Sequence, residues 1–355
     1  MLIDLNKNDF KRFEKLVEQI EKNKFNAEIN NLIISNKDMY FNKQNINNSL
    51  KINIKKYLNE SEEINVYLDQ THLKELNLNS FLDNDYVKAF KNISFIKDDY
   101  KLEFKKYKPY EIFISDDIEI KDNYKEITNL SYFNNEFQYL TLSYKNEIWM
   151  LITPNEINTM SKQIASAKGN VLTFGLGLGY YQFMISLKEN VNNIYIVEKD
   201  KNIIDIFSKF ILPRFQYKNK IKIINEDALI FIKKDILKYN FDFLFLDLYH
   251  NPNDGLEFYL RFKILENKFP QATFSYWLND SLLSLIRRIF INFLIEQYEG
   301  LNEKYYNKID TIEDQLMNYF YKTYKNKTIS SYNELSKLLL NDNLNYLIKN
   351  FKFIK

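Results

Sequence analysis

Val171-Leu-Thr-Phe-Gly-Leu-Gly-Leu-Gly-Tyr180 is the stretch that decides the fold, because it joins an apolar run to three alternating glycines. The chain has 355 residues and six glycines, and three of the six fall within this stretch. Glycine allows tight turns and lets a ligand approach the backbone closely. Backbone amides at a strand-to-helix turn can also face a ligand. The pattern predicts a buried strand, a glycine turn and a helix that begins at Tyr180.

Strands and helices alternate on both sides of this stretch, between residues 170 and 277. Short apolar runs are separated by segments whose apolar residues recur with helical spacing. Near-continuous apolar strands with helices between them are typical of a parallel sheet covered on both faces. The expected strands are 171–174, 194–197, 221–224, 241–246 and 272–277.

The rest of the chain predicts smaller parts around this α/β domain. A hairpin is expected to turn at Lys145-Asn146, and a helix over 157–167 is expected to end at Gly169. Ser331 and Glu334 have the spacing of a helix capping box. The predicted order is a mainly helical region of unknown role (1–108), a small β-element with the hairpin (109–160), the α/β domain (161–300) and a helical C-terminal appendage (301–355).

Acidic residues follow the predicted strands at the positions where a ligand would lie. Glu198 ends the second strand, 23 residues after Gly175, and Asp227-Ala228 follows the third. Asp247 follows the fourth strand and begins a polar loop. Ligands of open α/β sheets bind outside the carboxyl ends of the strands, where an acidic tip accepts hydrogen bonds from a ribose diol. The pattern therefore predicts a nucleoside site at this edge.

These residues resemble the S-adenosylmethionine site of class I methyltransferases, which have a Rossmann-like fold. The likeness is closer to the spermidine-synthase-like branch, which has a β-element before its nucleotide domain and motifs like Val197-Glu-Lys-Asp200 and Leu212-Pro213. It implies S-adenosylmethionine as the cofactor, with Glu198 on the ribose hydroxyls, Asp227 on the adenine and the glycine loop near the methionine moiety. The cofactor-binding residues that it implies are Gly175, Gly177, Gly179, Glu198, Asp227 and Ala228.

Three positions depart from these patterns. Thr173 stands two residues before the first glycine, where methyltransferases commonly have an acid. Leu178 and His250 stand where aminopropyltransferases carry carboxylates that bind a polyamine. Without those charges a polyamine cation loses its compensation. The resemblance therefore favours the fold over aminopropyl transfer.

The loop after the fourth strand supplies the predicted catalytic residues Asp247, Tyr249 and His250. A sulfonium is already a good leaving group, so the protein mainly aligns the acceptor and removes or masks its proton. Asp247 could orient an amine or hydroxyl, His250 could act as a general base, and Tyr249 could shape the pocket. Gln138 and Glu156, before the α/β domain, are further candidates to face the acceptor.

Composition excludes several classes of site and partner. Lys and Arg total 49 against 47 Asp and Glu, so the net charge of +2 gives no strong signal for nucleic acid. Cysteine is absent, which removes thiolate metal sites, and no metal ligand set is expected. The apolar run 282–295 is interrupted by Arg287-Arg288, and no membrane span or signal peptide is expected. A cytoplasmic location is predicted.

The sequence thus predicts an S-adenosylmethionine-dependent methyltransferase that acts on a small or medium-sized acceptor molecule. One alternative is an aminopropyltransferase that uses decarboxylated S-adenosylmethionine. Another is a non-catalytic module that binds a nucleoside or a partner, since a fold does not fix a function. The sequence leaves open which acceptor is methylated and which of its atoms is alkylated. It also leaves open whether the protein is a monomer or a homo-oligomer.

Overall fold

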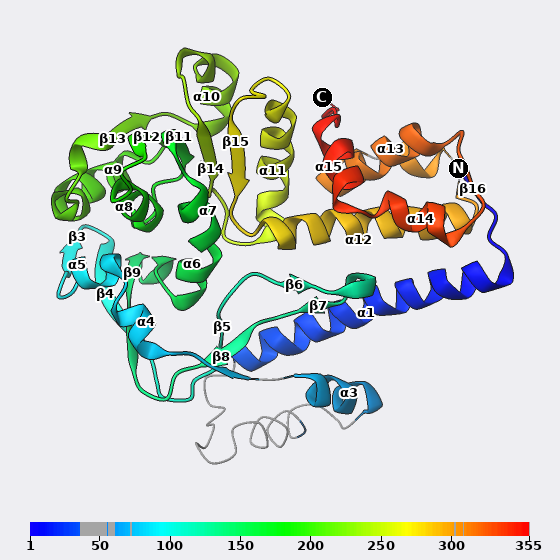
Figure 1. Cartoon of the computed structure of the whole chain (residues 1–355), viewed down its shortest axis with the longest axis horizontal. Coiled ribbons are helices and arrows are strands. Elements are labelled where there is room, and N and C mark those ends of the chain that lie inside the picture. Colours follow the sequence, from blue (N-terminus) through cyan, green and yellow to red (C-terminus); the bar gives the residue numbers. More distant parts are fainter. Residues whose placement is uncertain (36–54, 56–60, 72, 302, 308, 355) are drawn as a thin grey trace. The chain divides into compact units, whose positions relative to one another are not determined.

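The computed structural model describes residues 1–35, 55, 61–71, 73–301, 303–307 and 309–354 (Figure 1). The fold is mixed α/β, with two compact units. Unit 1 comprises Met1–Lys24, Ile120–Glu126 and Leu248–Lys355, and unit 2 comprises Phe25–Glu119 and Ile127–Asp247. This division differs from the four consecutive regions expected from the sequence, because segments distant along the chain pack into one unit.

A parallel sheet forms the core of unit 2. Its strands are β11 (Gly169–Phe174), β12 (Val191–Glu198), β13 (Ile221–Asn225) and β14 (Phe243–Leu246), which are ordered β13-β12-β11-β14. All neighbours within these four are parallel, as predicted. β11 therefore pairs with β12 on one side and β14 on the other, and the strand order reverses at β11 (Figure 1). Sheets of this type bind their ligands at such a reversal.

Helices cover both faces of this sheet. Thr173 is in register with Phe245, and Phe174 with Leu246, so Phe174 and Phe245 point to opposite faces. Phe231 of α10 (Ala228–Lys234) packs edge-on against Phe174, and Tyr181 of α8 (Tyr180–Ser186) stacks on Phe245. A third helix, α9 (Lys201–Ile206), continues as a π-helical segment, Phe207–Ile211.

A four-stranded antiparallel sheet comes before the parallel sheet along the chain, and its strands are ordered β10-β9-β4-β3. β9 (Phe137–Tyr144) and β10 (Glu147–Leu151) form the predicted hairpin, and Lys145 and Asn146 have φ of +50° and +67°, as a tight hairpin turn requires. β3 (Phe95–Lys97) and β4 (Tyr100–Tyr107) come from the region expected to be mainly helical. That expectation is wrong for these residues, because Tyr100, Leu102 and Phe104 alternate with polar residues and turn toward one side of the sheet.

The remaining elements of unit 2 are short. A three-stranded sheet has the order β2-β8-β5. β6 pairs with β7, and each of these two strands has one residue in unit 1, Ile120 and Glu126. Residues 157–167 form part of two helices that meet at Met160, not the single helix expected, and Gly169 opens β11 instead of stopping a helix. The bounds are α3 Glu62–Gln70, β2 Lys74–Glu75, α4 Leu78–Leu82, α5 Asp85–Ala89, β5 Phe113–Ile114, β6 Glu119–Ile120, β7 Glu126–Ile127, β8 Leu130–Tyr132, α6 Pro154–Thr159 and α7 Ser161–Ser166.

Unit 1 is mostly helical, with the buried helix α12 (Asn279–Tyr298) at its core. Phe290 and Phe293 of α12 pack against Phe320 of α13. Ser331 caps α14 by accepting the Glu334 amide, whereas the Glu334 carboxylate accepts from Ser330, so half of the expected capping box forms. The other elements are β1 Leu2–Ile3, α11 Pro252–Glu266, β15 Thr273–Tyr276, α13 Ile312–Tyr324, β16 Thr328–Ile329, α14 Tyr332–Leu338 and α15 Asn341–Lys349, while α1 (Lys7–Ser35) runs through both units.

Within the described part of the chain, no helix combines the length and apolar character needed to cross a bilayer. Strand β16 is the one strand described beyond Trp277, and it pairs with β1. The described residues after Trp277 therefore add no further strand to the parallel sheet.

Candidate functional site

The ends of the four parallel strands of unit 2 lie at one edge, where the sequence predicted a ligand. The Gly175 amide donates to the Val197 carbonyl at 3.1 Å, and the Asp247 amide donates to the Phe174 carbonyl at 3.0 Å. Glu198 is in register with Asn225, whose side-chain amide also donates to the Glu198 carbonyl at 3.0 Å. The glycine loop, Glu198 and Asp247 therefore start from adjacent strand ends.

The glycine loop owes its shape to left-handed backbone at each glycine. Gly175, Gly177 and Gly179 have φ of +93°, +52° and +75°, a region that other residues rarely adopt. Gln182, in the first turn of α8, donates from its side chain to the Gly175 carbonyl at 3.0 Å. A Cβ at Gly179 would lie 2.6 Å from the Phe207 ring, whereas a Cβ at Gly177 would meet nothing within 4 Å. Gly179 thus serves packing, and Gly177 borders open space.

This contrast predicts different outcomes for two alanine substitutions. Gly177→Ala should cost about 1 kcal/mol of unfolding free energy, because only backbone strain opposes it. Gly179→Ala should cost about 2–4 kcal/mol, because the methyl group also collides with a buried ring. Urea unfolding of both variants measures the difference. Equal losses would contradict the assignment of Gly179 to packing.

Glu198 points at the glycine loop. One carboxylate oxygen accepts the Leu176 amide at 3.2 Å, and the other accepts the Asp200 amide at 2.8 Å. A carboxylate has about four lone-pair sites, so each oxygen keeps the capacity to accept a further hydroxyl. The carboxylate is therefore fixed in orientation and able to receive both hydroxyls of a ribose.

Asp227 begins α10 as its N-cap. Its Oδ1 accepts the amides of Leu229 and Ile230 at 2.9 and 3.1 Å, so the acid performs a structural duty. Ala228 is buried as the first residue of the helix. Oδ2 accepts no hydrogen bond from the residues that the structure describes, which keeps an acceptor for an amino group. The adenine-binding role of Asp227 and Ala228 stays a prediction.

Asp247 is electrostatically linked to Glu156, a residue of α6. Burial raises the pKa of Asp247 from 3.8 to about 7. Burial and then the neighbouring Asp247 charge raise the pKa of Glu156 well above its usual value. A buried carboxyl group beside another carboxylate retains its proton near neutral pH. They form a carboxyl pair able to take up a proton or to face a cation.

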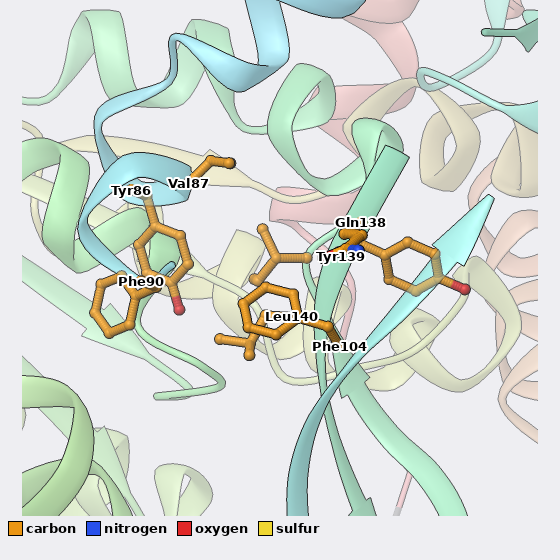
Figure 2. Close-up of a pocket in the computed structure, with 8 residues that line it drawn as sticks. Tyr86, Val87, Phe90, Phe104, Gln138, Tyr139 and Leu140 are labelled. Atoms are coloured by element: carbon orange, nitrogen blue, oxygen red, sulfur yellow. The ribbon is translucent and has the colours of Figure 1, made fainter. Parts of the chain in front are cut away.

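Gln138 was the other residue predicted to face the acceptor substrate. It is exposed on β9 and lines a cavity of about 20 Å³ beside Tyr86 (Figure 2). Such a volume holds about one water molecule and no nucleoside. Gln138 therefore lines a small cavity, while Glu156 belongs to the carboxyl pair.

Tyr249 and His250 belong to unit 1, whereas Asp247 ends unit 2. Tyr249 is buried, its hydroxyl donates to the Trp277 carbonyl, and a Cβ on Gly255 would lie 2.6 Å from its ring. The His250 side chain is exposed, and its amide donates to the Asp254 carboxylate at 3.1 Å. Both residues thus support the start of α11, and their catalytic roles stay predictions.

Two of the three positions that depart from the family patterns, Thr173 and Leu178, are buried and make internal contacts. Thr173 is fully buried, and its hydroxyl lies 3.4 Å from the Gln182 side-chain nitrogen. Leu178 is buried, and its carbonyl accepts the Tyr86 hydroxyl at 2.6 Å. Tyr86 and Asn225 were not among the predicted site residues. For Asn225, the amide side chain at a strand tip was the available signal. Among the described residues, no three His, Asp or Glu side chains gather as a metal site.

Comparisons with known proteins add little to this geometry. No protein-family model matches the chain, and no curated protein matches it. Solved structures that resemble it include spermidine synthase from Thermotoga maritima, with a TM-score of 0.28, 13% sequence identity, and coverage of 49% of this chain and 69% of that chain. A likeness of this extent assigns no activity to the chain.

Proposed function

We propose that this protein is an S-adenosylmethionine-dependent methyltransferase that acts on a small or medium-sized acceptor. The hydrogen bond between the Glu198 carboxylate and the Leu176 amide, at 3.2 Å, carries the proposal. It joins an acidic strand tip to a left-handed glycine loop at the carboxyl edge of a parallel sheet, where such sheets bind nucleosides. In this arrangement Glu198 binds the ribose hydroxyls and the Gly177 backbone lies next to the methionine moiety.

The carboxyl pair, Asp247 and Glu156, can take up the proton that the substrate loses when it receives the methyl group. The sulfonium of the donor leaves readily, so the protein mainly aligns the acceptor for in-line attack. A general base works best when its pKa lies near the operating pH. The pKa of about 7 for Asp247, raised by burial, meets this condition. Tyr249 and His250 are the further candidates for shaping the pocket and moving a proton.

Titration calorimetry of the purified protein with S-adenosylmethionine, S-adenosylhomocysteine and decarboxylated S-adenosylmethionine tests the proposal. We expect the first two to bind with dissociation constants of about 1–100 μM. ATP serves as the control, because it shares the adenosine but lacks the methionine moiety that the proposal places next to the Gly177 backbone. If neither of the two donor-related nucleosides binds, the proposed function is wrong.

Aminopropyl transfer is the second candidate, and the carboxyl pair is the observation that favours it. A protonated amine placed against Asp247 and Glu156 would gain charge compensation. The leucine at position 178 and the histidine at position 250 argue against it. Preferred binding of the decarboxylated nucleoside, with methylthioadenosine as the product instead of S-adenosylhomocysteine, would establish it. Tight binding without turnover across acceptor panels would instead indicate a non-catalytic module.

A further inference from the structure

The helix α5 contacts the glycine loop through a buried hydroxyl. Tyr86 is 1% exposed, and its hydroxyl donates to the carbonyl of Leu178, between Gly177 and Gly179, at 2.6 Å. Burial raises the pKa of Tyr86 far above its usual value, so the hydroxyl keeps its proton at every working pH. The donor is therefore always present.

The ring that carries this hydroxyl is held on several sides. It stacks on Phe90, with ring centres 4.1 Å apart, and meets the edges of Tyr180 and Phe183 in α8. Figure 2 shows Tyr86 and Phe90 together, on the far side of the small cavity from Leu140 and Phe104. The ring position is thus set by packing, independently of the hydroxyl.

The helix is also tied down at both ends. Asn84 caps its start and donates to the Tyr180 hydroxyl at 3.1 Å. The Arg214 guanidinium donates to the Ala89 carbonyl at its end, at 2.8 Å. The Tyr86 hydroxyl therefore has a fixed place from which to hold the loop.

The contact reaches Glu198 through two further hydrogen bonds, which the backbone of Leu176 joins. The peptide between Leu178 and Gly179 is held at its carbonyl by Tyr86 and at its amide by the Leu176 carbonyl, at 3.0 Å. The Leu176 amide in turn donates to Glu198. Glycine on both sides of Leu178 gives this peptide several accessible orientations. A bond to its carbonyl removes that freedom before a ligand arrives.

We infer that Tyr86 is a positioning residue for the donor site: its hydroxyl orders the Gly177–Gly179 backbone and, through Leu176, the Glu198 carboxylate. The inference rests on the proposed function of that site. Tyr86 does not touch the reacting atoms, so it acts on donor affinity and not on the chemical step. Pre-ordering a loop raises affinity by lowering the entropy lost on binding.

Tyr86→Phe tests this, because it removes the hydroxyl and keeps the packed ring. Tyr67→Phe is the matched control: Tyr67 is also buried in unit 2, and its hydroxyl donates to the Asn30 side chain at 2.6 Å, in the cluster of α1 and α3. Both variants should lower the melting temperature by a similar few degrees. Only Tyr86→Phe should weaken S-adenosylhomocysteine binding, by about tenfold.

Two further measurements separate positioning from a general loss of stability. In Tyr86→Phe, KM for the donor should rise about tenfold while kcat changes less than about twofold. Amide hydrogen exchange at Leu178 and Gly179, without ligand, should be about tenfold faster than in Tyr67→Phe. If wild type binds the nucleoside and both variants bind it equally, the inference is overturned and the proposed function stands. If wild type binds no donor nucleoside, the inference and the proposed function are both wrong.

Discussion

Glu198→Gln should weaken the binding of S-adenosylmethionine and S-adenosylhomocysteine by about 100-fold. Two ribose hydroxyls that donate to a carboxylate make charge-assisted hydrogen bonds of about 1.5–3 kcal/mol each. Glutamine keeps the shape but has one acceptor oxygen and no charge. That oxygen can keep only one of the two amides that Glu198 now accepts, from Leu176 and Asp200. Titration calorimetry measures the loss.

Asp242→Asn is the control for this substitution. The Asp242 carboxylate accepts the Asn170 amide at 2.8 Å, at the amino end of the same strand that leads into the glycine loop. Asp242 directly precedes β14, so its carboxylate lies at the amino ends of the strands, opposite the proposed site. Its variant should bind the nucleosides within about twofold of wild type. Unchanged binding by Glu198→Gln would contradict the nucleoside site itself.

The local part of the fold was predictable because each feature is coded by nearby residues. The glycine spacing around Gly177 requires a turn between a buried strand and a helix, and the apolar runs can only be buried strands when helices separate them. The hairpin at Lys145-Asn146 follows from the alternation on either side of it. Strands β3 and β4 were not predicted, because lysines occupy the exposed positions of Tyr100–Tyr107. The alternation of apolar and polar residues was therefore hidden in a polar composition.

The contacts that complete the site were not predictable, because they join residues far apart in the sequence. Tyr86 reaches Leu178 across 92 positions, and neither residue carries a local pattern that names the other. Glu156 was a candidate for facing the acceptor, yet its electrostatic link to Asp247 joins two residues 91 positions apart in the sequence. The same reason explains the division into units, since packing decides which segments share a core.

Raising the pH from about 5 to about 8 should destabilise the protein through the carboxyl pair. Burial raises the pKa of Asp247 from 3.8 to about 7, so the folded state holds a proton that the unfolded chain releases. This contribution to stability is fully present below about pH 4 and is lost as the pH rises to about 7. A difference of about three pKa units corresponds to about 4 kcal/mol. Glu156, whose pKa is also raised, adds in the same direction.

Asp247→Asn should remove much of this pH dependence, because asparagine has no charge to bury. At pH 8 the variant should be about 2–4 kcal/mol more stable than wild type, and near pH 4 the two should be about equal. Glu156→Gln should act in the same direction, because glutamine also has no charge to bury and the pKa of Glu156 is raised by burial and by Asp247. Urea unfolding, followed by the fluorescence of Trp149 in unit 2 and Trp277 in unit 1, measures these differences, with Asp242→Asn as the control.

Asp247→Asn should lower the methyltransferase activity while it raises the stability of the fold. This combination would identify the carboxyl pair as functional. If Asp247 accepts the acceptor's proton, kcat/KM of wild type rises with pH and levels off above an apparent pKa near 7. Asp247→Asn should lower kcat about 100-fold or more while stabilising the fold at pH 8. A variant that is both more stable and nearly inactive shows that the buried charge is kept for chemistry. If Asp247→Asn keeps full activity, a group other than Asp247 accepts the proton.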